Sequence, residues 1–191
     1  MVANHPFGVI DGTILCHLAA QARGDFRILI NAVLCRDKDL APYFLPVDFS
    51  PGKAAMKNNV ATGRRAREAM AEDIPVLIFP SGFVSTAGKF GTGRAVDAPW
   101  TTFAAKLISD ARANVVPIFF HGQNSRAFHI ASHLSESLRM AFLIREARAR
   151  FGTRFDVTIG DTLAYESLEE IKGRKALTHY LYDAVQQLDE A

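Results

Sequence analysis

Short runs that are apolar at almost every position alternate along this chain with helix-forming stretches, and this alternation is the strongest constraint on its fold. Residues 75–79 read Pro-Val-Leu-Ile-Phe, and residues 115–120 read Val-Val-Pro-Ile-Phe-Phe. Strands covered on both faces, as in parallel sheets, lack the apolar-polar alternation of half-exposed strands. Further strands are predicted at 26–34, 44–48 and 155–159, and residues 1–3 read as the stub of another buried strand.

Helices are predicted between these strands. Residues 11–23 carry apolar side chains at helical spacing and stop at Gly24, and residues 53–71 are rich in helix-forming Ala, Lys, Arg and Met. Further helices are expected at 100–111, over most of the stretch before Phe155, and at 167–188. Helices that connect parallel strands cover both faces of the sheet. The sequence therefore predicts an α/β fold with a mostly parallel sheet and helices on both faces.

The composition is that of a globular domain and excludes several function classes. The 191 residues are 49% hydrophobic and 22% charged, which suits a single domain over 1–191 with a substantial core. A net charge of +2 argues against nucleic acid as a partner. Cys16 and Cys35 cannot build a disulfide framework and have no metal-ligand spacing. We therefore expect two buried thiols, a reducing compartment and no metal site.

The sequence contains no evident membrane-spanning or secretory segment. No run of 18 residues is apolar and uncharged, and the first residues lack the basic start and apolar stretch of a signal peptide. The chain opens directly on strand-like Met-Val-Ala, without the element that a parallel sheet needs before it, so we expect that upstream residues are missing. These features predict a cytoplasmic protein.

A histidine and an aspartate flank a tight turn near the start of the chain. Residues 4–11 read Asn-His-Pro-Phe-Gly-Val-Ile-Asp, with Asp11 at the predicted start of a helix. A carboxylate bonded to one imidazole nitrogen fixes the tautomer and leaves the other nitrogen free to take a proton from a hydroxyl. In the alternative interpretation, Asp11 only caps the helix and His5 is a turn residue. The spacing alone leaves both interpretations open.

The strand predicted at 75–79 runs into a loop with the features of a ligand site. Pro80 breaks the strand, and Ser81, Gly82 and Ser85 follow it. Ligands of open α/β sheets bind at the carboxyl ends of strands, so these residues are expected to line a crevice. The loop continues to Pro99, and loops of this length in compact domains are usually functional. An ordinary strand-ending turn is the alternative.

Two more segments complete the set of motifs. Residues 45–50 read Leu-Pro-Val-Asp-Phe-Ser and contain Asp48. Pro117 lies inside the apolar run at 115–120, and a proline there favours an edge strand or a break in the hydrogen-bond ladder.

Together these segments, in this order and with these separations, resemble the glycerophospholipid acyltransferases that include bacterial 1-acylglycerol-3-phosphate acyltransferase. The resemblance covers residues 4–163. The family's first motif is Asn-His, four residues and Asp, whereas five residues stand here between His5 and Asp11. The Asn-His-Pro-Phe-Gly version, with Asp-Ala-Pro-Trp at 97–100 and His-Gly-Gln-Asn-Ser at 121–125, is similar to the subgroup of hemolysin-like and ornithine-lipid-type acyltransferases.

The resemblance implies transfer of a fatty acyl group from an acyl thioester, acyl-CoA or acyl carrier protein, to the hydroxyl of a lysolipid, without a cofactor. It makes His5 the general base and Asp11 its orienting partner. Backbone amides around Ser81 and Gly82 are candidates for stabilising the oxyanion. No serine or cysteine nucleophile is needed if the acceptor attacks directly. The residues expected to contact substrate are Asn4, Asp48, Lys53, Ser81, Gly82, Ser85 and Pro117.

Two positions depart from the pattern of the better-known members. Their second motif ends in an arginine and their third reads Phe-Pro-Glu-Gly, whereas Phe49 and Ser81 stand at the corresponding positions here. Loss of a cation together with its carboxylate companion argues for a different head group on the acceptor. Lys53 and Lys57 are candidates for replacing the charge, with solvated helix lysines as the alternative.

The stretch Arg139–Arg154 combines five arginines with Met140, Phe142, Leu143 and Ile144. This basic amphipathic pattern suits an anionic membrane surface, and a lysolipid must be collected from a bilayer, so we expect peripheral association with the inner face of a membrane. A core-packed helix with a solvated arginine face is the alternative. At the level of function, a non-catalytic lipid- or acyl-carrier-binding domain and a thioesterase that uses His5-activated water remain the rivals.

Overall fold

The strands of the protein form two small sheets that meet edge to edge. The computed structural model describes residues 1–35 and 37–190. The first sheet, in the order β3-β2-β4, is all parallel, and the second, in the order β1-β5-β6, pairs β1 with β5 in parallel and β5 with β6 antiparallel. The strands are β1 (Val2–Ala3), β2 (Arg27–Asn31), β3 (Phe44–Val47), β4 (Val76–Leu77), β5 (Pro117–Phe120) and β6 (Val157–Ile159).

A parallel bridge joins the two sheets beyond the end of β4. Val2 pairs with Ile78, and the Ala3 N–H donates to the Ile78 carbonyl at 3.1 Å. The predicted α/β class is confirmed. The single sheet is replaced by two small ones, and β6 runs against the direction of its neighbour.

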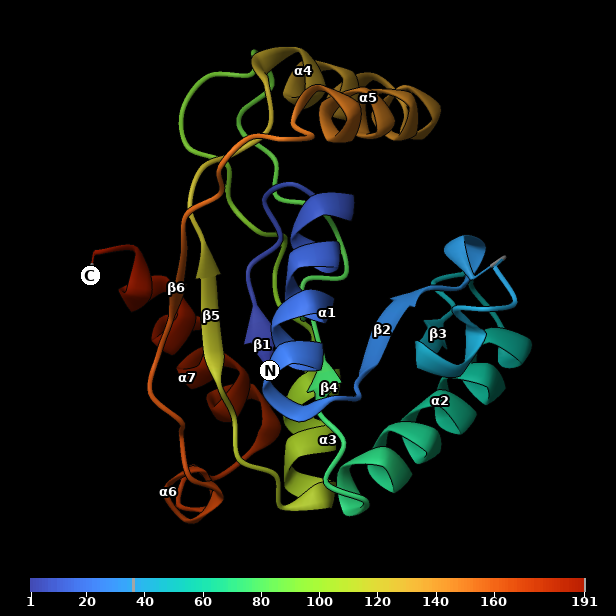
Figure 1. Ribbon diagram of the computed structural model, residues 1–191, viewed down its shortest axis with the longest axis vertical. Helices are drawn as coiled ribbons and strands as arrows, with labels where there is room; N and C mark the ends of the chain where they lie inside the picture. Colours follow the sequence, from blue (N-terminus) through green and yellow to red (C-terminus); the bar gives the residue numbers. More distant parts are fainter. Residues whose placement is uncertain (36, 191) are drawn as a thin grey trace.

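Seven α-helices surround the strands within the described residues (Figure 1). They are α1 (Val9–Arg23), α2 (Lys53–Ala71), α3 (Phe103–Ala111), α4 (Arg126–Leu134), α5 (Glu136–Ala149), α6 (Tyr165–Glu169) and α7 (Arg174–Gln186). Short 3-10 turns occupy Ala32–Leu34, Ala41–Tyr43 and Gln187–Asp189. No helix of the described chain is long and apolar enough to cross a bilayer.

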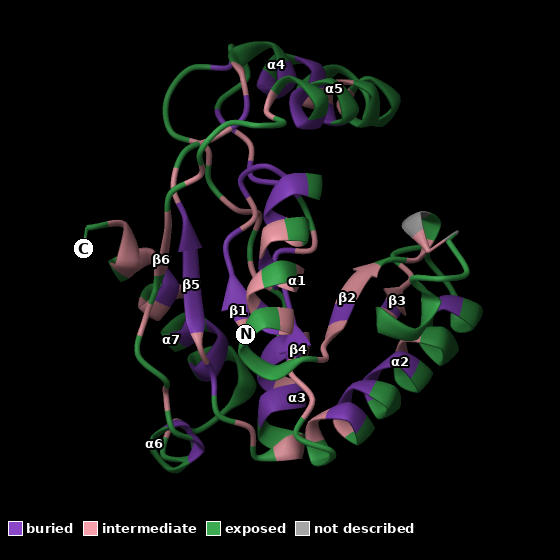
Figure 2. Cartoon of the chain, viewed as in Figure 1, coloured by how far each residue is buried: buried purple, intermediate pink, exposed green. Residues whose placement is uncertain are grey.

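The period-2 alternation of strand side chains divides the core between two helical layers. Ala3 and its neighbours on one face of the sheets pack with Leu15 and Ala19 of α1. Val2 and its neighbours on the other face pack with side chains of α2, α3 and α7. The prediction of helices on both faces is confirmed, and the strands β1, β4 and β5 between them are buried at every residue (Figure 2).

Two local expectations are corrected by the structure. The helix expected at 167–188 is divided into α6 and α7, and Gly173, with a φ of 95°, stands at the start of the second helix. Pro117 does not mark an edge strand, because β5 lies between β1 and β6. It is the first residue of β5, a position where the missing N–H disturbs the ladder least.

The carboxyl ends of β1, β4 and β5 point toward the helical pair α4–α5, which lies across this end of the molecule (Figure 1). Residues 4–8 follow β1, and the loop that starts at Pro80 follows β4. The only β-pairing within this described loop is an isolated antiparallel bridge between Thr86 and Val96. The motifs found in the sequence therefore meet at one end of the sheets.

Candidate active site

His5 and Asp11 form a close pair in the turn that connects β1 to α1. His5 Nδ1 lies 3.0 Å from Asp11 Oδ1, and the Asp11 carboxylate has no exposed surface. The His5 side chain keeps 17% of its surface exposed, so solutes can reach it. The two atoms lie within ion-pair distance without the alignment of a hydrogen bond. A carboxylate beside Nδ1 favours the neutral tautomer with its proton on Nδ1, which leaves the lone pair on Nε2. Among the described residues, no group bonds to Nε2.

Asp11 also caps the N-terminus of α1. Its Oδ2 accepts the N–H groups of Phe7 at 2.8 Å and Gly8 at 3.1 Å, and its Oδ1 accepts the Gly12 N–H at 2.8 Å. A negative charge is favoured at a helix N-terminus, where the first N–H groups have no partner within the helix. The two interpretations of Asp11 left open by the sequence are therefore not exclusive, since one carboxylate caps the helix and contacts His5.

Gly8 gives the turn between His5 and Asp11 a backbone conformation that other residues rarely adopt. It has a φ of 80°, a region that residues with a Cβ rarely adopt. A Cβ built there would lie 2.6 Å from Leu143 Cδ1 and 2.9 Å from Val84 Cγ2. The turn between His5 and Asp11 therefore requires a glycine at position 8.

The His5 imidazole is held between polar and apolar contacts. It stacks on the Phe79 ring with centroids 4.0 Å apart, at the point where the strand-loop segment leaves the sheet. The His5 carbonyl accepts the Ser85 N–H at 2.8 Å. Ring and backbone are thus fixed by the segment that the sequence predicted to line a crevice.

Asp97 is the residue of this site that sequence reasoning did not single out. Its Oδ1 accepts the His5 N–H at 3.2 Å and the Ser85 hydroxyl, and its Oδ2 accepts the Trp100 indole N–H at 2.9 Å. A carboxylate with three donors on it is a rigid anchor, and this one holds the backbone of His5. The only signal in the sequence was the Asp-Ala-Pro-Trp stretch, which carried the resemblance but gave no role.

The polar groups of Ser81 and Gly82 are engaged within their own turn. The Gly82 N–H donates to the Phe79 carbonyl at 2.9 Å, and the buried Ser81 hydroxyl donates to the Phe83 carbonyl at 2.8 Å. The Gly82 amide is therefore not free to stabilise an oxyanion in this conformation. The Phe49 ring covers Gly82 so closely that a Cβ there would lie 2.9 Å from it.

The other four predicted substrate residues have different placements. The Asn4 amide is used on β5, where it donates to the Phe120 carbonyl at 3.0 Å and accepts the Phe120 N–H at 2.7 Å. Pro117 lies at the opposite end of that strand, paired with Val2, and so away from His5. Asp48 Oδ1 accepts the Ser50 N–H, a bond that lowers the pKa of the carboxyl below its usual value. Lys53 is exposed at the first turn of α2.

A cavity of about 570 Å³ lies behind the turn that carries His5. Pro6, Ser85 and Asp97 line it on the side of the turn, and Tyr182 and Gln186 line it on the side of α7. It borders the backbone of the His5 turn, and the imidazole is not part of its lining.

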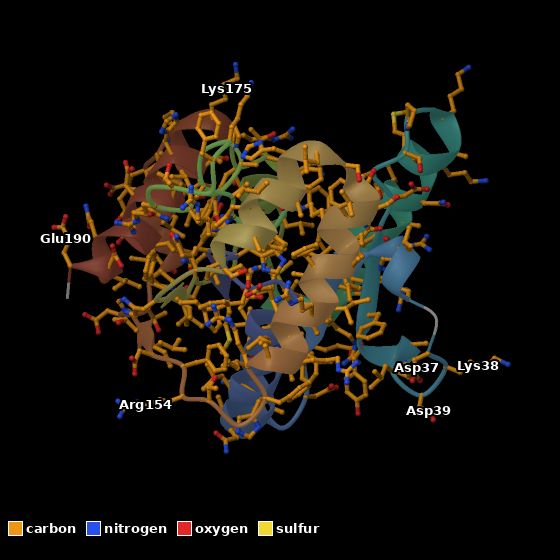
Figure 3. All side chains as sticks on the ribbon, turned by 90° about the horizontal axis from the view of Figure 1, so that it is seen from above. Asp37, Lys38, Asp39, Arg154, Lys175 and Glu190 are labelled. Carbon is orange, nitrogen blue, oxygen red and sulfur yellow. The ribbon has the colours of Figure 1, made fainter. Side chains whose placement is uncertain are left out.

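The stretch predicted to face a membrane is only partly free to do so. Arg139 donates to the Val84 carbonyl and Arg150 to the Gln123 carbonyl, and Arg154 lies 3.0 Å from Asp156. Leu143 is buried, whereas Ile144 is 59% exposed, so the apolar residues do not share one outward face. Figure 3, which looks down on α4 and α5, shows Arg154 directed outward at the rim of the molecule.

A family model described as acyltransferase matches residues 1–178. The chain belongs to this acyltransferase family. Among curated relatives, the acyltransferase is 27% identical to a lyso-glycine lipid O-acyltransferase of Phocaeicola vulgatus and to another of Bacteroides thetaiotaomicron. Both alignments span 202 positions and include 98% of this chain, with 67% and 68% of the respective relatives. The expectation of an acyltransferase is confirmed at the level of the family.

Proposed function

We propose that this acyltransferase transfers a fatty acyl group from an acyl thioester to the hydroxyl of a lysolipid. The family supports acyl transfer, and the names of the two relatives support a lysolipid with a glycine head group as acceptor. The observation that carries the proposal is the contact of 3.0 Å between an accessible imidazole and a fully buried carboxylate. A general base is the group that a neutral alcohol needs before it attacks a thioester.

His5 acts first as base and then as acid. Nε2 takes the proton of the acceptor hydroxyl while the hydroxyl oxygen bonds to the carbonyl carbon of the thioester. The tetrahedral intermediate then collapses, the carbon–sulfur bond breaks, and the proton passes from Nε2 to the leaving thiolate. Products are the ester and a free thiol, and His5 returns to its neutral form. The Asp11 carboxylate stabilises the imidazolium between the two steps.

The hydroxyls near His5 favour direct attack by the acceptor over an acyl-enzyme. The Ser81 hydroxyl donates to a backbone carbonyl and the Ser85 hydroxyl donates to Asp97, so neither is directed at the imidazole. A serine nucleophile would need a hydrogen bond to its base. Acyl-CoA and acyl carrier protein present the same reactive thioester, so either can serve as the donor.

We propose that the acceptor lysolipid comes from a membrane and that the exposed side of α4 and α5 contacts the membrane surface. Leu134, Leu138 and Ile144 are 70%, 42% and 59% exposed there, and Arg145 and Arg148 are exposed beside them. Exposed apolar side chains flanked by arginines suit an anionic lipid interface.

The test of the proposed function is product analysis with a radiolabelled acyl thioester. The protein is incubated with labelled acyl-CoA or acyl carrier protein, with and without a lysolipid panel that includes lyso-glycine lipid and 1-acylglycerol 3-phosphate. Acylated lipid that appears only when a lysolipid is present supports the proposal. Labelled free fatty acid without acylated lipid would identify a thioesterase, and no conversion with any donor would identify a binding domain.

A further inference from the structure

Arg139 is a half-buried cation that lacks a carboxylate partner. Arg27, Arg67 and Arg150 are also half-buried, and each has an Asp or Glu oxygen within 4.0 Å. Over the described residues, 1–35 and 37–190, no carboxylate lies within that distance of the Arg139 guanidinium. Burial lowers the pKa of Arg139 below its ordinary value against the opposing charge of Glu136, and a guanidinium remains charged at neutral pH. Such a group gains most from an anion supplied by a ligand.

One peptide group connects this cation to the catalytic turn. The Val84 carbonyl accepts a hydrogen bond from Arg139 Nη2 at 2.6 Å, and the N–H of the same peptide group, that of Ser85, donates to the His5 carbonyl at 2.8 Å. Since the atoms of a peptide group are fixed in one plane, the guanidinium nitrogen and the His5 carbonyl are at most about 8 Å apart. The Arg139 guanidinium therefore lies one peptide group away from the backbone of His5.

The surface beside Arg139 is aromatic. The Arg139 guanidinium carbon lies 5.9 Å from the centre of the Phe83 ring, and Phe49 packs on Phe83 with ring centres 5.6 Å apart. Phe49 and Phe83 are 47% and 50% exposed. An apolar floor with a cation at its border suits an amphiphile that has one charged end. By contrast, Lys53 and Lys57, the cations suggested by the sequence, are exposed on α2.

We propose that Arg139 binds the carboxylate head group of the acceptor lysolipid, an assignment that rests on the proposed lysolipid acyltransferase function. A guanidinium offers two parallel N–H groups that match the two oxygens of a carboxylate. One such cation balances the single charge of a carboxylate, whereas a phosphate dianion would call for more. Glycine that is acylated on its amine keeps an ionised carboxylate at neutral pH. The head group then lies over Phe83 and the acceptor hydroxyl lies at His5.

The experiment compares acceptors that differ only in charge. Lyso-glycine lipid, its carboxyl methyl ester and 1-acylglycerol 3-phosphate are presented in neutral detergent micelles to the wild type, Arg139→Gln and Arg139→Lys. The control is Arg64→Gln, which removes the same charge from an exposed position on α2, 3.6 Å from Glu68. The quantity measured is the ratio of kcat/KM for the acid to kcat/KM for the ester. This ratio within one variant does not depend on the folded fraction.

Arg139→Gln is expected to lower the ratio at least about tenfold through KM for the acid, because a hydrogen bond to a charged group is lost. Arg139→Lys should give an intermediate ratio, and Arg64→Gln the wild-type ratio. The same ratio in Arg139→Gln and wild type overturns the assignment and leaves the proposed function intact. A strong preference for the phosphate acceptor that depends on Arg139 overturns the carboxylate as ligand.

Failure of the proposed function gives a different result. If the wild type acylates none of these lipids, calorimetric titration of the acid and the ester into the same variants, without donor, still measures the contribution of Arg139 to binding. A wild-type preference for the acid that Arg139→Gln abolishes supports the anion site. Equal binding of acid and ester to the wild type overturns it.

Discussion

At the scale of single residues, the Asp11 carboxylate has two roles that mutation can separate. Asp11→Asn keeps one acceptor oxygen for the N–H groups of residues 7 and 8 but removes the charge that faces His5. We expect acyl transfer to fall about 10²-fold or more and unfolding free energy to fall by about 1 kcal/mol. Initial rates and urea denaturation of the same preparation measure both effects. Normal turnover in a destabilised variant would leave Asp11 with the helix-capping role alone.

Asp97 is expected to affect turnover more than acceptor binding. An amide in Asp97→Asn must direct its NH2 group at one of the donors that the carboxylate now accepts, so the backbone of His5 should lose its fixed position. We predict a fall in kcat of about tenfold or more, with KM for the lysolipid within about threefold of wild type. Asp156→Asn, at a 67% exposed carboxylate, serves as control. A change confined to KM would place Asp97 in substrate binding.

The contact between His5 and Asp11 was predictable at this scale, but the contact of Asp97 with the His5 backbone was not. His5 and Asp11 are close in sequence, so a local turn is enough to bring them together. Asp97 is separated from His5 by 92 positions, and its contact depends on where the loop after Pro80 returns to the sheet. Local spacing contains no information on that path. The position of Arg139, 55 residues from Val84, escaped prediction for the same reason.

At the scale of helices and loops, α5 has an exposed basic side whose lipid affinity can be measured. Arg145→Gln together with Arg148→Gln should weaken sedimentation with anionic vesicles at least about tenfold, because each arginine near such a surface contributes about 1 kcal/mol. Binding to neutral vesicles should change little, since Ile144 and Leu138 are kept. Arg64→Gln with Arg112→Gln removes the same charge elsewhere. Equal losses in both double variants would show that net charge alone governs binding.

The buried imidazole of His129 ties α4 to the loop after Pro80. Its Nδ1 accepts the Ala87 N–H at 3.3 Å, and burial is the main cause that lowers the pKa of His129 below 6.5, against the opposing effects of the Asn124 backbone and of Glu146. The unfolded chain therefore binds a proton first as the pH falls. This residue costs stability progressively from about pH 6.5 down to its folded pKa and has no effect on stability above that range.

The corresponding measurement is urea denaturation at several pH values. Wild type should lose stability between pH 7.5 and 5.5 faster than His129→Gln, whose amide oxygen can accept the Ala87 N–H without titrating. An identical pH slope in the two proteins would contradict the role given to His129.

The sequence predicted element positions most accurately where a run of residues with one structural preference was long. The range predicted for α2 matches Lys53–Ala71, because most of its nineteen residues are good helix formers. The break between α6 and α7 was missed, since a glycine inside an amphipathic pattern is compatible with a continuous helix. The strands are shorter than their apolar runs, since Ile78 beyond β4 and Val115 before β5 form only isolated bridges.

At the scale of the whole molecule, pairing between distant strands could not be derived from the sequence. The apolar runs predicted covered strands, and the two core clusters on opposite faces agree with this. The antiparallel direction of β6 depends on pairing with β5 across 37 to 41 positions, and the sheet that contains β1 depends on pairing with β5 across 115 positions. What the sequence could predict is that the motifs meet, since strand ends of a parallel arrangement share an edge.

The proposed acyl transfer depends most directly on His5 as its general base. The decisive measurement is the rate of acylated lysolipid formation by His5→Ala and wild type under single-turnover conditions. His17→Ala, which removes an exposed histidine from α1, serves as the matched control, and thermal unfolding is recorded for each protein. We predict a loss of about 10²–10⁴-fold in folded His5→Ala and none in His17→Ala. Transfer by folded His5→Ala within about tenfold of the wild-type rate would show that His5 is not the general base.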